Sequence, residues 1–372
     1  MKLNPFALER FFAKHEFSAP YLLSCSDPEA LTLNDLLALA DEESLALWQS
    51  LSLGYTESQG HPLLLDEIAS LYTGLERENI VEIIPEEGIF IAMNVLLSKG
   101  DHVVATYPGY QSLTEIAAGI GCEISRWHPD QEGDMRFSVE SLAPLIRDNT
   151  RLIIINFPHN PTGALLTGAE LEQVVEMAEA HGIMIFSDEM YRYSEIDPDD
   201  RLPSVCEIYP KGITLGGLSK SFALPGLRVG WLATRNEETL AAVKTFKDYT
   251  TICGSAPSEI LALMALRART RILHRVVSII FKNLTRLDTF FAEHADIFRW
   301  RKPKAGTVAF PELTSGEDVS AFCDALLKDK GVLLVPAPIF GLDNNHFRIG
   351  YGRINMPEAL AELDAFLKET RA

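Results

Sequence analysis

Short apolar runs alternate with helical stretches between about residues 60 and 235. The runs 152–157, 183–187 and 213–215 are almost continuously apolar, and the first is followed by a turn rich in Pro and Gly. Strands are also predicted over 103–107 and 229–234. Uninterrupted apolar runs of this length are typical of parallel strands that are buried on both faces of a sheet. Because helical segments such as 168–182 separate the runs, the sequence predicts an α/β fold: a mostly parallel sheet flanked by helices.

Each of these runs is followed by polar side chains that can take part in chemistry. Asn160 follows the first run, Asp188 and Tyr191 follow the second, and Lys220 follows the third. Ligands of open α/β sheets bind beyond the carboxyl ends of the strands. A lysine held at such a position can lose its proton and form an imine with a carbonyl. Three strand ends of this kind in one chain favour a functional site over unrelated capping or surface residues.

The pattern changes after residue 255. The apolar periodicity predicts nearly unbroken helix over 257–294, followed by short strands near 307–310, 332–335 and 346–349. A last helix is predicted over 357–370. This part of the chain is therefore expected to form a separate, smaller α+β unit.

The composition narrows the classes of function. A chain of 372 residues is long enough for two domains, or for one large domain with a smaller one. A net charge of −19 argues against nucleic acid and anionic membranes as partners. No apolar stretch is long enough to cross a bilayer. The five cysteines are scattered singly, which favours a cytoplasmic protein without a structural zinc or iron–sulfur site.

Four short motifs carry a resemblance to a known family. In chain order they are Asn160-Pro-Thr-Gly, Asp188-x-x-Tyr191, Ser219-Lys220 and Arg228-x-Gly230. In this combination and spacing the sequence resembles the class I/II aminotransferases, which are fold-type I enzymes that use pyridoxal 5′-phosphate (PLP). The resemblance extends over nearly the whole chain, from about Tyr55 to Arg353.

The resemblance implies how the chain is divided. Residues 46–275 would form the large PLP-binding domain, and residues 1–45 and 276–372 would together form the small domain. The long predicted helix would bridge the two. The first residues have the pattern of a short amphipathic helix and would belong to the small domain.

The resemblance also implies a role for each motif residue. Lys220 would bind the aldehyde of PLP and move the substrate proton, and Asp188 would keep the pyridine nitrogen protonated. Asn160 and Tyr191 would contact the phenolic oxygen of the ring, and Tyr191 would assist catalysis. Tyr110, in Tyr107-Pro-Gly-Tyr110, would stack on the ring.

The phosphate contacts are where the sequence departs from the family pattern. The cofactor-binding residues expected at this end are Arg228, Ser219, Glu86 and Glu87. Pro85 donates no N–H group at the helix start, and the two glutamate side chains would have to point away from a dianion. Gly217 stands where relatives usually have a phosphate-binding serine.

Two further residues bear on the substrate and on the assembly. Arg348, in His346-Phe-Arg-Ile-Gly350, matches the arginine that grips the substrate α-carboxylate with two prongs, and Asn160 belongs to the same substrate-binding set. Tyr55 resembles the tyrosine that reaches the phosphate of a neighbouring subunit. A homodimer with active sites at the subunit interface is therefore expected.

The leading hypothesis is an aminotransferase that moves an amino group between an L-amino acid and a 2-oxo acid. An alternative keeps PLP but changes the product, giving an arginine-type cyclase, oxidase or lyase, because the segments 85–88 and 157–163 resemble arginine-modifying relatives such as capreomycidine synthase. The two outcomes share their first steps, so the motifs leave both open. A non-enzymatic PLP-fold sensor is disfavoured, because no helix-turn-helix or basic DNA-binding appendage is present.

Overall fold

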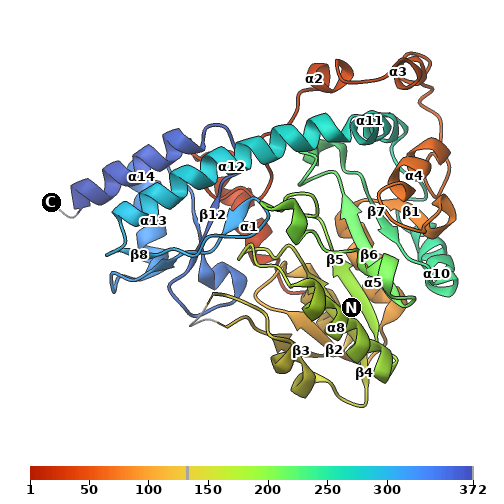
Figure 1. The fold of residues 1–372 in the computed structure, drawn as a ribbon, viewed down its shortest axis with the longest axis horizontal. Coiled ribbons are helices and arrows are strands. Elements are labelled where there is room, and N and C mark those ends of the chain that lie inside the picture. The colour runs from red at the N-terminus through yellow and green to blue at the C-terminus, as the bar shows by residue number, and fades with distance from the viewer. Residues whose placement is uncertain (131–133, 371–372) are drawn as a thin grey trace.

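A seven-stranded sheet forms the centre of the molecule (Figure 1). The structure is a computed structural model that describes residues 1–130 and 134–370. The strand order is β1-β7-β6-β5-β4-β2-β3; neighbours from β6 to β3 are parallel, and β7 is antiparallel to both β6 and β1. The predicted α/β fold with a mostly parallel sheet is confirmed. The strands are β1 Ile80–Ile83, β2 His102–Thr106, β3 Glu123–Trp127, β4 Thr150–Asn156, β5 Met184–Asp188, β6 Gly212–Gly217 and β7 Gly230–Ala233.

Two strands were not predicted from the sequence, and both lie at the edges of the sheet. In β3 most side chains are at least partly exposed, so the strand lacks a continuous apolar run. In β1 the four residues are buried, but Glu82 interrupts the apolar pattern. The hydrophobic pattern therefore identifies the central strands best, because only these are covered on both faces.

The register of the central strands brings their carboxyl ends together. Asn156 at the end of β4 pairs with Asp188 at the end of β5, which in turn pairs with Leu215 of β6. Since these three strands are parallel, the loops that follow them leave the sheet at the same edge. Asn160 and Lys220 lie on two of these loops.

Helices cover both faces of the sheet because alternate strand residues point to opposite sides. Leu152 and Ile154 pack under α5, α6 and α10, whereas Ile153 and Ile155 pack under α7 and α8. A third apolar cluster joins α4 and α11 to the β7 end of the sheet. The helices around the sheet are α4 Pro62–Ala69, α5 Pro85–Leu96, α6 Ser112–Ile120, α7 Val139–Leu142, α8 Gly168–His181, α9 Val205–Ile208, α10 Glu237–Lys247 and α11 Ala256–Arg267.

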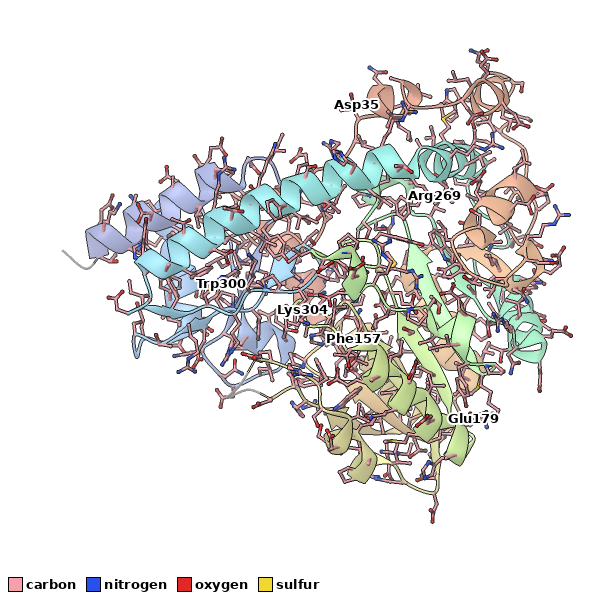
Figure 2. The ribbon with its side chains drawn as sticks, viewed as in Figure 1. Asp35, Phe157, Glu179, Arg269, Trp300 and Lys304 are labelled. Carbon is pink, nitrogen blue, oxygen red and sulfur yellow. The ribbon has the colours of Figure 1, made fainter. Side chains whose placement is uncertain are left out.

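The long helix predicted over 257–294 is interrupted once. α11 ends at Arg267, and α12 (Arg269–Glu293) begins after Ala268, whose backbone is not helical (φ −88°, ψ 8°). α11 is buried on nearly all sides, whereas α12 buries one apolar stripe and exposes its other side to solvent. Figure 2 labels Arg269 at this junction, from which α12 runs toward the C-terminal unit.

The C-terminal unit is built on α12 and two small sheets. Its core combines α12, α13 and α14 with strand residues such as Phe298 and Phe347. The strand predicted over 332–335 begins only at Val335. The elements are α13 Val319–Lys330, α14 Met356–Thr370, the sheet β11 (Val335–Pro336)-β12 (Phe347–Gly350)-β9 (Val308–Ala309), and the pair β10 (Glu312–Leu313)-β8 (Phe298–Arg299).

The N-terminal segment is bound to this unit. Tyr21 forms a bridge with Val332, and the Leu23 carbonyl accepts a hydrogen bond from the Gly350 N–H at 2.9 Å. The helix α1 (Ala7–His15) packs its aromatic side on Val335 and Phe340. α2 (Leu33–Leu37) and α3 (Glu42–Gln49) then lead the chain back to α11. In the parts of the chain that the structure describes, no helix combines the length and apolarity that a membrane span requires.

The contact between Gly350 and the N-terminal segment gives a prediction about stability. A Cβ atom at position 350 would lie 2.2 Å from the Cys25 carbonyl oxygen, so Gly350→Ala must push the two backbones apart. We expect it to lower the free energy of unfolding by roughly 1–3 kcal/mol, measured by urea denaturation. Gly168→Ala is the matched control because nothing lies within 4 Å of its added Cβ. Equal midpoints for the two variants would contradict this account.

Candidate active site

A cavity of about 620 Å³ opens at the carboxyl ends of β4, β5 and β6. Its walls come from the loops after these strands, from the start of α5, from β12 and from the N-terminal segment. It brings together most of the residues selected from the sequence: Tyr110, Asn160, Asp188, Tyr191, Ser219, Lys220, Arg228, Arg348 and Glu86.

Lys220 is positioned by the loop that follows β6. The Ala223 N–H bonds the Lys220 carbonyl at 2.9 Å, and Leu218 is tied to Val229, so the loop folds back on itself. The Lys220 side chain enters the cavity, where Nζ donates to the Ser26 Oγ at 2.9 Å. The amine is therefore held by a neutral acceptor.

Asp188 ends β5 and is buried. Burial raises the pKa of its carboxyl group to about 7, against a hydrogen bond from the Met190 N–H to Oδ1 (3.1 Å) that favours the charged form. Its carbonyl accepts from the Asn156 amide at 3.0 Å, which fixes the strand end. A buried carboxyl group with this pKa is suited to a ligand that brings its own positive charge.

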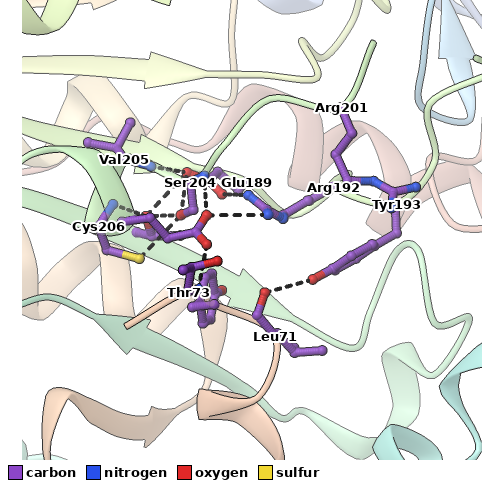
Figure 3. A network of polar contacts seen from close by, with 12 residues as sticks. Leu71, Thr73, Glu189, Arg192, Tyr193, Arg201, Ser204, Val205 and Cys206 are labelled. Atoms are coloured by element: carbon purple, nitrogen blue, oxygen red, sulfur yellow. Dashed lines mark hydrogen bonds and ion pairs between the residues drawn. The ribbon is translucent and has the colours of Figure 1, made fainter. Parts of the chain in front are cut away.

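A polar network behind Asp188 fixes the turn that follows it (Figure 3). Glu189 accepts hydrogen bonds from the Ser204 hydroxyl at 3.0 Å, the Val205 N–H at 3.1 Å and the Thr214 hydroxyl at 3.2 Å. Arg192 pairs with the other carboxylate oxygen at 3.4 Å. Burial raises the pKa of Glu189, and the Arg192 guanidinium opposes this effect. Glu189 therefore anchors the turn from the far side of the strand and does not line the cavity.

Arg348 and Tyr191 both line the cavity. Arg348 is completely buried, and its Nη1 donates to the Asn160 Oδ1 at 3.3 Å. Its Nε and Nη2 atoms are buried and have no hydrogen-bond partner among residues 1–130 and 134–370, and burial lowers its pKa. The Tyr191 hydroxyl donates to the Ser26 carbonyl at 3.2 Å. Unpaired buried N–H groups are costly, so the guanidinium is prepared for an anion.

Tyr110 forms part of the wall between the cavity and the N-terminal segment. Its ring centroid lies 4.9 Å from that of Phe6, and its hydroxyl donates to Glu9 Oε1 at 3.2 Å. One face of the ring packs on the apolar cluster of α5 and α6. The ring is thus fixed from several sides.

The end of the cavity near α5 supplies donors for an anion. The first N–H groups of α5 have no partner within the helix, which is the usual anion-binding feature of a helix start. The Ser219 hydroxyl is buried without a partner. Arg228 is exposed and held in a left-handed conformation (φ 58°), with Nη1 donating to the Pro225 carbonyl at 3.0 Å.

The two acidic residues of this helix start behave differently. Glu87 turns away from the cavity, and its Oε1 accepts from Thr250 and Thr251, the latter through N–H at 3.2 Å and the hydroxyl at 2.9 Å. Glu86 remains at the cavity wall, where Ser112 donates to it at 3.2 Å. The sequence predicts that both side chains point away from the phosphate. In the structure only the Glu87 side chain lies outside the cavity, and Glu86 lines it.

Pro85 and Gly217, the two departures from the family pattern, lie side by side. A Cβ atom on Gly217 would lie 3.2 Å from the Pro85 ring and 3.0 Å from the Met190 side chain. A Cβ on Gly230 would lie 2.7 Å from the same ring. The proline therefore fills the space that a side chain at position 217 would need. The two substitutions are explained as one packing unit.

The sequence matches a family model whose description is "Aminotransferase class I and II", over residues 22–363. The chain belongs to this family. It is a PLP-dependent aminotransferase of fold type I.

Relatives of this aminotransferase cover most or all of the chain. A solved PLP-dependent aminotransferase from Streptococcus suis 89-1591 is 33% identical with a TM-score of 0.93, and the match covers 99% of each chain. Capreomycidine synthase from Streptomyces vinaceus is 28% identical over 71% of this chain and 67% of its own. Aromatic-amino-acid aminotransferase 2 from Thermococcus litoralis is 28% identical over 76% of this chain and 74% of its own.

The residues of the cavity fit PLP. A buried carboxyl group, an amine and an aromatic ring can receive a cationic ring that carries an aldehyde: Asp188, Lys220 and Tyr110. The orphaned Ser219 hydroxyl and the free start of α5 can receive its phosphate. These donors suit a dianion despite the nearby Glu86, because Arg228 lines the same end.

Tyr55, like Glu87, is a selected residue that the structure does not bring to the cavity. Tyr55 is 92% exposed and lies on the loop that precedes α4. Its expected role depends on a second subunit.

Several cavity residues of the aminotransferase were not selected from the sequence. Ser26 holds both Lys220 and Tyr191, and Glu9, Glu16 and Asp27 line the wall opposite the strand ends. All four lie in the N-terminal segment, which contacts the C-terminal unit and also the start of α6, where the Ala7 N–H donates to the Gln111 Oε1 at 2.8 Å. The amphipathic pattern of α1 indicated its apolar side but not what its polar side faces. Cys25 is buried and also lines the cavity.

The raised pKa of Asp188 predicts how the cofactor-free enzyme responds to pH. In the unfolded chain this carboxyl ionises near pH 4, so folding is favoured at low pH and stability is lost as the pH rises through about 7. In Asp188→Asn this loss between pH 5 and 8 should be smaller by roughly 1–3 kcal/mol. Denaturant unfolding at a series of pH values measures it. Identical pH profiles for the two proteins would show that Asp188 is not responsible.

Proposed function

We propose that this aminotransferase exchanges an amino group between an amino acid and a 2-oxo acid in the cavity at the ends of β4, β5 and β6. The observation that carries the proposal is Arg348: a buried guanidinium with two unpaired N–H positions in the cavity that also contains Lys220. Amino acids and 2-oxo acids share one group that such a guanidinium binds with two prongs, the carboxylate next to the reacting carbon.

When bound, PLP supplies a ring that withdraws electrons from the substrate α-carbon and a carbon that accepts the amino group. Asp188 holds a proton on the ring nitrogen through a charge-assisted hydrogen bond. Cofactor binding brings the positive charge that the buried carboxylate lacks. The ionised form of Asp188 then becomes the stable one.

Lys220 is the residue that would hold the aldehyde of the cofactor, and its amine would serve as general base and acid for the substrate α-proton. Its Nζ lies 2.9 Å from the Ser26 hydroxyl, a neutral group that can hold the amine without protonating it. The Tyr191 hydroxyl donates to the carbonyl of the same serine, so the Lys220 and Tyr191 side chains are held by one residue of the N-terminal segment. This segment keeps the amine within the cavity while the proton is moved.

Arg348 and Asn160 orient the substrate. Asn160 holds Nη1 of the guanidinium at 3.3 Å, which leaves Nε and Nη2 for the α-carboxylate. Fixing the carboxylate would also fix the orientation of the α-carbon in the cavity. Binding at this point would therefore select the proton that Lys220 removes.

The likeness to capreomycidine synthase supports a second candidate. In this second candidate function, the same residues of the present chain would bind the amino acid and remove its α-proton, but the amino group would leave with the product. Treating the holoenzyme with an amino acid alone distinguishes the candidates. Transamination converts bound PLP stoichiometrically to pyridoxamine phosphate, and the second candidate consumes substrate while PLP remains.

The role of Lys220 gives the direct test of the proposal. Lys220→Ala should lower the rate of amino-group exchange by about 10²–10⁴-fold or more, because it removes the general base. Borohydride should fix PLP to the wild-type protein at Lys220, detected by mass spectrometry, and not to the variant. Lys211→Ala, at an exposed lysine near Gly182, is the control. A variant at position 220 that exchanges amino groups at the wild-type rate would refute the assignment.

We also propose that the enzyme is a homodimer with shared active sites. Exposed apolar side chains gather near Tyr55: Leu53 on the same loop, and Tyr249 and Ile252 on the segment that Lys247 ties to the Ser58 carbonyl at 2.8 Å. Apolar groups exposed together usually mark an interface. The segment also contacts the start of α5 through Glu87, so a partner bound here would stand next to the phosphate end.

Disruption of this surface should therefore affect assembly and cofactor together. We expect Tyr249→Glu to shift the protein toward monomers in sedimentation velocity and to raise the Kd for PLP by about tenfold or more. Phe17→Ser, at an exposed aromatic residue outside this surface, should change neither. A wild-type monomer that binds PLP fully at micromolar concentration would contradict the shared site.

A further inference from the structure

The cavity contains more carboxylates than the cofactor can use. Its walls carry Glu9, Glu16, Asp27, Glu86 and Asp188, against the cations Lys220, Arg228 and Arg348. Asp188 is assigned to the cofactor ring, and Glu86 lies at the phosphate end, bonded to Ser112. The remaining three come from the N-terminal segment and form one wall.

These three carboxylates differ in what holds them. Asp27 is paired with Arg353 at 2.6 Å, and Glu9 accepts from the Tyr110 hydroxyl at 3.2 Å. No hydrogen bond or ion pair holds the Glu16 carboxylate in the described parts of the chain, 1–130 and 134–370, although its backbone N–H donates to the Phe12 carbonyl at 2.8 Å. The side chain is partly buried, and its pKa is raised, first by burial and then by the carboxylates of Asp27 and Glu9, while Arg353 and Lys220 act in the opposite direction. The Glu16 carboxylate therefore has two acidic neighbours and no ion-pair partner of its own.

The geometry of α1 directs this wall toward the substrate. Glu9, Phe12 and Glu16 are spaced i, i+3 and i+7, so they share one face of the helix and its end. The Phe12 ring centroid lies 5.5 Å from the guanidinium carbon of Arg348. Glu16 lies about one helical turn (roughly 5.4 Å) beyond Phe12, and its side chain lines the same cavity as the guanidinium.

The guanidinium is the independent sign that this cavity takes a ligand. Its unpaired Nε and Nη2 atoms are completely buried and would receive the α-carboxylate. An amino acid held there would share the cavity with Phe12 and the acidic wall. Among the cavity residues that the structure describes, no further cation is left to meet an acidic side chain once PLP and the α-carboxylate are bound.

We propose that the amino-acid substrate has a cationic side chain, a primary amine or a guanidinium carried on about three or four carbon atoms, and that Glu16 binds it. Glu9 and Asp27 strengthen the negative field without being the main partner. Phe12 covers the aliphatic part of the side chain. This inference rests on the proposed function, because it needs the α-carboxylate at Arg348.

Matched substrates isolate the charge. Ornithine, lysine and arginine are compared with norleucine and citrulline, which have similar length without the positive charge, and with alanine and glutamate. The measurement is the rate at which each changes the absorption of bound PLP in the holoenzyme. We expect kcat/KM for the cationic set to exceed that of the neutral matches by about 10- to 100-fold, the usual value of a charge-assisted hydrogen bond.

A substitution then assigns the effect to Glu16. Glu16→Gln keeps the shape and should remove most of the advantage of arginine over citrulline, with less than about threefold change for norleucine. The Kd of 2-methylornithine, which has no α-proton to lose, should rise similarly in calorimetry. Lys14→Gln is the control because it changes a charge on α1 outside the cavity. Circular dichroism and thermal unfolding of each variant establish that the fold is retained.

The outcomes separate the inference from the function on which it rests. A preference for cationic substrates that disappears in Glu16→Gln supports the inference. Faster reaction of glutamate, alanine or citrulline than of arginine and ornithine overturns it and leaves the proposed function standing. An unchanged preference in Glu16→Gln overturns the assignment to Glu16. A panel in which no amino acid changes bound PLP overturns the proposed function itself.

Discussion

Two adjacent carboxyl groups are buried at the end of β5, and only one of them has a cation of its own. Glu189 is balanced by Arg192 and by three hydrogen-bond donors. Asp188 points to the other side of the strand, into the cavity, and keeps a high pKa because burial dominates. Consecutive side chains of a strand point to opposite faces, so Glu189 stabilises the turn on one side while Asp188 stays available to a ligand on the other. The remainder of the site is arranged around this reserved charge.

The second half of the site comes from outside the sheet. Ser26 receives the Lys220 amine and the Tyr191 hydroxyl, although it lies far from both along the chain. Its own carbonyl is also held by the Thr307 hydroxyl at 2.6 Å. The N-terminal segment is therefore a working wall of the cavity, fixed by the C-terminal unit and in contact with the catalytic loops.

The parts of this molecule that follow from local pattern were predicted well. Continuous apolar runs identified β4, β5 and β6, and the parallel arrangement then placed Asn160, Asp188 and Lys220 at one edge. Edge strands were missed because exposure or a single glutamate breaks the pattern. The break at Ala268 was also missed, since the apolar residues continue across it and only their surroundings change.

The parts that depend on contacts between distant segments could not be read from the chain. Nothing in the residues around Ser26 or Glu16 signals that they meet Lys220 or face Arg348. The pairing of Pro85 with Gly217 belongs to the same class: each looked like an isolated departure, and only the packing of one against the other explains both. The division of the chain into residues 46–275 and two flanking segments stays a prediction.

The bond between Leu23 and Gly350 joins nearly the first and nearly the last residues of the chain. During synthesis the segment that carries Ser26 leaves the ribosome early, but its contacts with the C-terminal unit form only after β12 has been made. The sheet can assemble before this, because its strands follow one another closely. The pocket for the vitamin is thus completed only once β12 is present, so a product truncated before β12 would fail to retain the cofactor.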